Sequence, residues 1–170
     1  GYWSRGLGDV YKRQALECHG GSGYIEESIM PRLYREAPLN SIWEGSGNVM
    51  CLDVLRALQR DKNALPALFR ELASAKGSNK NFDESFSHLK ETLQDPIDLE
   101  IKARLLTEKM ACLLQASIFI KSGEEEKVSA FCNSRLGPRW SGAFGTLPTD
   151  TSFEYIAVSY THLRAHETNS

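Results

Sequence analysis

The stretch "ECHGGSGY" at Glu17–Tyr24 and the stretch "RLYREAPLNSIWEGSGNVM" at Arg32–Met50 each contain a glycine-rich turn. Glycines at a helix boundary expose backbone N–H groups and let a ligand approach the main chain closely, as Gly20 and Gly21 could do here. Taken alone, the first turn is more commonly a tight connection between helices. It also lacks the G-x-G-x-x-G spacing and the preceding strand of a dinucleotide-binding fold.

The second turn, "WEGSGN", sets a carboxylate between a tryptophan and glycines at the entrance of an apolar helix. Such surroundings raise the pKa of a carboxyl group, which would make Glu44 a stronger base. Ser46 and Asn48 can hydrogen-bond a ligand, but both are also common helix-capping residues. The alternative is therefore a capped helix in which Glu44 forms a salt bridge with Arg32 or Arg35.

Together the two turns resemble the C-terminal helical domain of the flavin-dependent acyl-CoA dehydrogenases. That family has a Q-x-x-GG-x-G stretch, an Arg–acidic pair, and a Glu-Gly-Thr/Ser turn nine residues beyond the arginine. Here "GGSG" matches the first element, Arg35-Glu36 matches the second, and Glu44-Gly45-Ser46 follows Arg35 at the same spacing. The resemblance covers about Ala15–Gln59, and Glu17 stands where the family has glutamine.

The resemblance implies FAD as the cofactor. In the family the glycine stretch packs against the adenosine-diphosphate part of FAD, commonly the FAD of a neighbouring subunit, which assigns that contact to Gly20 and Gly21. The flavin part would contact Ser46 and Asn48. A homo-oligomer, a tetramer in the full-length protein, is the expected assembly.

The resemblance also implies a reaction, in which an α-proton leaves an acyl-CoA thioester while the flavin accepts a hydride from the β-carbon. It makes Glu44 the catalytic base and places Trp43 beside the acyl pocket. The base must lie in a dry pocket, because a solvated carboxylate is a weak base toward carbon. Some branches of the family carry the base on another helix, in which case Glu44 is structural.

The sequence of Met30–Leu58 is similar to that of one branch of the family, the alkylation-response proteins of the AidB type. Those proteins carry an extra helical domain, so we expect residues 15–60 to end the dehydrogenase domain and residues 61–157 to form the extension. The alternative function for this branch is a DNA-associated protective protein. Between Lys121 and Trp140 the basic residues outnumber the acidic ones by only one, which gives duplex binding little support.

Apolar periodicity predicts helices in the remaining chain, and no segment alternates as a strand does. Helices are expected over residues 48–59, 63–75 and 82–93. Asp95-Pro96 supplies an N-cap and an N1 proline for a long helix to about Ile120, whose final turns "ACLLQASIFI" are apolar nearly all round and predict burial. The expected fold is all-α, the C-terminal helical-bundle portion of an acyl-CoA dehydrogenase fold followed by a helical extension.

The two ends of the chain are related through the genetic code. One permitted set of codons for Ser4–Gln14, read as its reverse complement two bases out of phase, encodes Val158–Glu167. This sequence also resembles the transposase mosaic-end adapter used to build sequencing libraries. We therefore interpret residues 1–14 and 158–170 as adapter-derived and non-native.

Charge and cysteine content narrow the class of protein further. The formal net charge is −2, and it becomes about −4 without the two end segments, because residues 1–14 carry +2. The four cysteines form no C-x-x-C pair and have no histidine at ligand spacing, so we expect neither a disulfide framework nor a metal site. Reduced, buried cysteines fit the cytosol or another reducing compartment, and we expect a cytoplasmic protein. No apolar run reaches the roughly 18 residues that cross a bilayer.

Overall fold

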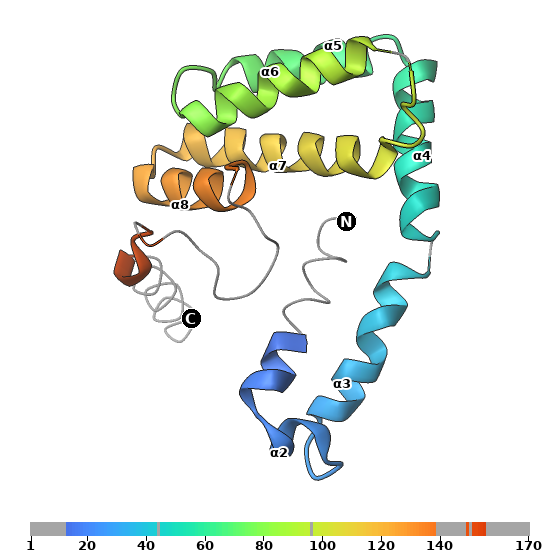
Figure 1. The fold of residues 1–170 in the computed structure, drawn as a ribbon, viewed down its shortest axis with the longest axis vertical. Helices are drawn as coiled ribbons and strands as arrows, with labels where there is room; N and C mark the ends of the chain where they lie inside the picture. The colour runs from blue at the N-terminus through green and yellow to red at the C-terminus, as the bar shows by residue number, and fades with distance from the viewer. Residues whose placement is uncertain (1–12, 44, 96, 139–148, 150, 156–170) are drawn as a thin grey trace, which may run out of the picture. The chain divides into compact units, whose positions relative to one another are not determined.

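The computed structural model describes residues 13–43, 45–95, 97–138, 149 and 151–155. Every regular element among these residues is helical and none is a strand, which confirms the all-α prediction. Figure 1 shows the arrangement of the helices along the chain. Apart from residues 13 and 14, the segments interpreted as adapter-derived lie outside the described residues.

The helices group into two compact units. The first contains the described residues of 1–64 and 96–108, and the second contains those of 65–95 and 109–170. Helix α7 (Ala103–Ser122) contributes its first turns to the first unit and its remaining turns to the second.

The first unit is a succession of short helices that leads to one longer helix. Residues 13–18 are helical, and they are followed by α2 (Gly21–Tyr24), α3 (Met30–Glu36), the 3-10 helix η1 (Ala37–Ser41) and α4 (Gly47–Arg60). Pro31 lies in the first turn of α3, where its missing N–H has no helical partner to lose. Helix α4 confirms the helix predicted over residues 48–59, and its buried side chains are Cys51 and Leu55.

The second unit has a well-formed apolar core. It contains α5 (Ala64–Ala73), α6 (Lys80–Gln94), the later turns of α7, and α8 (Glu125–Arg135), and α6 contacts α8. The largest fully buried side chains here are Leu72, Phe82, Phe86, Leu89, Leu113 and Cys132. The helices predicted over residues 63–75 and 82–93 are thus confirmed, and the phenylalanine and leucine stripe of α6 forms one part of this core.

The long helix predicted from Asp95-Pro96 is wrong at its start. Residues 97–102 form turns, and α7 begins only at Ala103. Asp98 has a φ of +61°, in the left-handed region, which interrupts an α-helical backbone. The side chain of Ile101 is 83% exposed, so an additional helical turn here would bury no apolar surface to stabilise it.

The burial predicted for the end of α7 is confirmed for one part of its circumference and wrong for another. Cys112, Leu113 and Ala116 are buried, as is Ser117, whose hydroxyl donates to the carbonyl oxygen of Leu114 at 2.8 Å. The side chains of Leu114 and Ile118 are exposed. These two residues are four apart and therefore share a face of the helix, which the sequence could not distinguish from its apolar neighbours.

Candidate functional site

The first glycine turn connects the helical residues 13–18 to α2. Gly20 has a φ of +55° and a ψ of −140°, a backbone conformation that glycine adopts far more readily than other residues. A Cβ atom on Gly23 would clash with the carbonyl oxygen of Leu16. A Cβ atom on Gly20 or Gly21 would meet no heavy atom within 4 Å. The main chain at Gly20 and Gly21 is therefore open to a neighbouring group, whereas Gly23 is packed.

The second glycine turn leads from η1 into α4. Glu44 lies outside the described residues. Gly45 has a φ of +111°, and Ser46 follows it as the N-cap of α4 with an extended backbone. The side chain of Ser46 makes no capping hydrogen bond to α4, so the capping role considered from the sequence is wrong for this serine. Its hydroxyl is exposed and is not used to begin the helix.

Asn48 lies in the first turn of α4 and has a partner far away in the sequence. Its Oδ1 atom accepts a hydrogen bond from the guanidinium of Arg104 at 3.1 Å. Both residues are exposed, and the bond links the start of α4 to the start of α7 within the first unit. This bond uses only the Oδ1 atom, and among the described residues the side-chain N–H₂ group of Asn48 has no hydrogen-bond acceptor.

Trp43 lies just after η1 and is 53% exposed. Its backbone N–H donates to the carbonyl oxygen of Leu39 at 3.1 Å, which fixes the main chain at the end of η1. A large aromatic side chain that is half exposed is suited to contact another apolar group.

Arg35 forms an ion pair that sequence reasoning missed. Its guanidinium donates to both carboxylate oxygens of Glu26, at 2.6 Å and 3.4 Å. This hydrogen bond lowers the pKa of Glu26, with a smaller contribution from Arg32, and it raises the pKa of Arg35. Glu26 therefore occupies the guanidinium of Arg35, with which Glu44 was considered as a partner. The sequence did not predict this pair, because residues nine positions apart across a turn follow no helical or strand period.

The two glycine turns lie at opposite ends of the segment formed by α3 and η1 (Figure 1). The predicted site residues that the structure describes, Gly20, Gly21, Trp43, Ser46 and Asn48, are all exposed and all belong to the first unit. The described chain thus presents two separate exposed turns. One ligand could contact both turns of the same chain only if it extended between them. Otherwise it would contact the first turn of one subunit and the second turn of another.

Two basic side chains of the second unit are paired with acidic ones. Lys121 forms an ion pair with Glu71, and Lys127 forms one with Glu124 at 2.5 Å. Two of the basic residues counted for a DNA-binding face are thus neutralised by neighbours, and this arrangement does not favour contact with phosphates.

The cysteines are all free. Cys18 is exposed, and Cys51, Cys112 and Cys132 are buried, with burial raising the pKa of Cys132 to about 11. Within the described residues no set of three or more histidine, cysteine or acidic side chains could hold a metal ion. No helix in that same part of the chain has the length and apolar character needed to cross a membrane.

Comparison with known proteins identifies the family. The family model described as the C-terminal domain of acyl-CoA dehydrogenases matches residues 3–59, a range that includes both glycine turns. AidB of Escherichia coli (strain K12), which carries an acyl-CoA dehydrogenase name, is 39% identical over 132 residues, 78% of this chain and 24% of its own length.

Two further relatives carry the same family name. Acyl-CoA dehydrogenase family member 11 of Caenorhabditis elegans is 37% identical over 84 residues, 49% of this chain and 14% of the relative. YngJ of Bacillus subtilis (strain 168) is 42% identical over 45 residues, 26% of this chain and 12% of the relative. The chain spans at most about a quarter of the length of these curated relatives. It belongs to the acyl-CoA dehydrogenase family, on its AidB-type branch, and carries part of the helical C-terminal domain of that family.

Proposed function

We propose that this chain is part of an FAD-dependent acyl-CoA dehydrogenase-like oxidoreductase, which forms an α,β-double bond in an acyl-CoA thioester. The observation that carries the proposal is the pair of exposed turns within the matched residues 3–59, with the second turn following Arg35 at the spacing of the family. In this proposal residues 15–60 end the dehydrogenase domain, residues 61–157 form a helical extension, and the full-length protein is cytoplasmic.

The described residues fit a cofactor of this kind. The absence of heavy atoms within 4 Å of a Cβ position on Gly20 and Gly21 leaves room for a ligand directly beside the main chain. Ser46 has a hydroxyl that no helix cap engages, and Asn48 keeps its side-chain donors. We assign Gly20 and Gly21 to the adenosine-diphosphate part of FAD and Ser46 and Asn48 to the flavin part. When bound, FAD supplies the hydride acceptor.

We assign the removal of the α-proton to Glu44. Its neighbours are Trp43, whose half-exposed ring can line an acyl pocket, and Gly45, whose φ of +111° turns the chain toward α4. A carboxylate beside an aromatic ring becomes a stronger base once water is excluded from it, because desolvation disfavours its charged form. The elements that exclude water would come from the remainder of the full-length protein.

The surface of the first unit supports an assembly larger than this chain. Its described residues from 24 to 49 include nine large apolar side chains that are exposed: Tyr24, Ile25, Ile29, Leu33, Tyr34, Leu39, Ile42, Trp43 and Val49. A large share of exposed apolar side chains in one segment is typical of a region that another protein surface covers. We propose that the remaining domains and the neighbouring subunits of a homo-oligomer, a tetramer, cover it.

FAD retention by the full-length protein tests the proposal. Gly21→Ala adds a methyl group that meets no atom of this chain, so it should leave folding unchanged while obstructing a cofactor packed against the main chain. We expect the FAD content of the purified Gly21→Ala protein to fall at least about tenfold, and that of the neighbouring surface variant Ser22→Ala to match the wild type. The isolated chain should bind no FAD.

Two results would contradict this assignment. Full-length protein purified without any flavin, and unable to bind added FAD, would exclude the proposed function altogether. A Gly21→Ala protein that retains FAD as the wild type does would keep the function but remove Gly21 from the cofactor site.

A further inference from the structure

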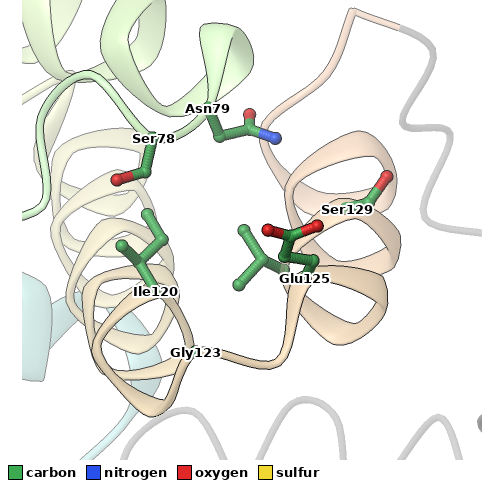
Figure 2. A pocket seen from close by; sticks show the side chains of 7 residues that line it. Ser78, Asn79, Ile120, Gly123, Glu125 and Ser129 are labelled. Atoms are coloured by element: carbon green, nitrogen blue, oxygen red, sulfur yellow. The ribbon is translucent and has the colours of Figure 1, made fainter.

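A pocket of about 550 Å³ lies in the second unit. It is bounded by the turn that precedes α6, by the end of α7 and by the first turns of α8, and it is lined by Asn79, Ile120, Gly123, Glu125, Val128 and Ser129 among others. Figure 2 shows these side chains around the open space. The volume is in the range of sites that hold small organic molecules.

Hydrogen bonds of side-chain amides connect the α6 side and the α8 side of the pocket. Asn81 Nδ2 of α6 donates to Asn133 Oδ1 of α8 at 2.8 Å, and Asn133 Nδ2 donates to the hydroxyl of Ser129 at 3.3 Å. Ser129 itself lines the pocket. The spacing between the α6 side and the α8 side is therefore set by hydrogen bonds that exist without any ligand, which is a form of preorganisation.

Asn79 directs a donor into the pocket. Its Oδ1 atom accepts from the backbone N–H groups of Asn81 and Phe82, at 3.0 Å and 3.3 Å, and so caps α6. The side-chain N–H₂ group must then point away from the helix, and Figure 2 shows it facing the open space opposite the carboxylate of Glu125.

Glu125 supplies a hydrogen-bond acceptor on the α8 side of the pocket. Its carboxylate is directed into the pocket in Figure 2, and it makes no ion pair with the described residues, whereas the adjacent Glu124 is paired with Lys127. The C-terminal end of α7, a helix of 20 residues, also faces this space and carries partial negative charge. The first turn of α8 also contains Glu126, so the partial positive charge at this helix end is opposed by two acidic side chains, Glu125 and Glu126.

We propose that this pocket binds a small organic amine in its protonated form. The ammonium group would pair with Glu125, the aliphatic part would cover Ile120 and Val128, and a polar oxygen on the same ligand would accept from Asn79. Such a ligand would contact the acidic, apolar and amide groups that line the pocket, and none of these lining residues belongs to the proposed cofactor or acyl-CoA site.

Titration of the full chain with 4-aminobutan-1-ol, followed by NMR of backbone amides, tests this proposal. We expect saturable shifts at Ser78, Gly123 and Ser129, and none with butane-1,4-diol, which has the same length and no charge. Glu125→Gln should weaken the binding about tenfold or more, the effect of removing one charge-assisted hydrogen bond. Glu126→Gln removes a neighbouring exposed charge that does not line the pocket and should leave the affinity unchanged.

The same titration can overturn the proposal in three ways. Absence of saturable shifts at the pocket amides excludes an amine site. Equal shifts with the diol show that the ammonium group is not recognised. Equal weakening in Glu125→Gln and Glu126→Gln shows a general attraction to the acidic start of α8 rather than a site, with the dispersed amide spectrum of each variant serving as the control for folding.

Discussion

Gly20, Gly21 and Gly23 stand within four residues of one another, and each has a different local environment. The φ of +55° explains Gly20, and the approach of the Leu16 carbonyl oxygen explains Gly23. Gly21 has neither a positive φ nor a close neighbour. Folding of this chain therefore gives no reason for glycine at position 21, which is why we associate that position with a ligand.

This difference predicts opposite effects of two alanine substitutions on the stability of the first unit. Gly23→Ala should lower the free energy of unfolding by about 1–3 kcal/mol, because the added methyl group displaces the main chain at Leu16. Gly21→Ala should change it by less than about 0.5 kcal/mol. Hydrogen exchange of the amides of residues 13–24 measures both, and equal protection in the two variants would contradict the packing described here.

The buried thiol of Cys132 predicts an alkaline effect on stability. Burial raises its pKa from 9.0 to about 11, so the folded protein retains a proton that the unfolded chain releases. The free energy of unfolding should therefore be unaffected by this group below pH 9 and fall as the pH rises from about 9 to about 11. Urea denaturation of the wild type and of Cys132→Ala over this range isolates the contribution, since other groups titrate in both proteins.

Identical alkaline slopes in the two proteins would contradict the burial of this thiol. The exposed Cys18 provides an internal comparison, because a thiol reagent should modify it in the folded chain while Cys51, Cys112 and Cys132 react only after unfolding.

At the scale of elements, helices with one buried stripe could be predicted from the sequence and irregular ones could not. The spacing of Phe82, Phe86 and Leu89 identified α6, because all three side chains enter one core. The predicted start of α7 is wrong, because an N-cap aspartate and a proline indicate only that a helix can begin there. The left-handed backbone of Asp98 depends on tertiary contacts that the sequence does not reveal. The side chain of Ile101 has no burial to favour helix there.

The N-termini of α4 and α6 predict a contrast between two capping residues. Asn79 accepts two backbone N–H groups of α6, and Asn79→Ala should cost about 1 kcal/mol of stability. Ser46 makes no such bond to α4, so Ser46→Ala should cost less than about 0.5 kcal/mol. Amide exchange in each helix reports its own local stability. A larger loss in α4 than in α6 would show that Ser46 does act as a cap.

At the scale of the whole molecule, the two units differ in how well they bury their apolar side chains. The second unit encloses phenylalanine and leucine in a core, whereas the first unit leaves Tyr24 78% exposed and Ile29 64% exposed. The chain spans at most about a quarter of the length of its curated relatives, and the proposed oligomer would cover this surface.

The family could be identified from two short turns, because their residue types and spacing are local in the sequence. The partners of Arg35 and Asn48 could not, because Glu26 and Arg104 meet them only in the folded chain.

The most direct test of the proposed function is anaerobic flavin reduction by saturated acyl-CoA thioesters in the full-length protein, compared with its Glu44→Gln variant. The variant should retain FAD and reduce it at least about 10³-fold more slowly, because the carboxylate that accepts the α-proton is gone. Reduction of the variant at the wild-type rate would contradict the role of Glu44. Failure of the wild-type protein to reduce its flavin with any acyl-CoA would contradict the proposed dehydrogenase activity.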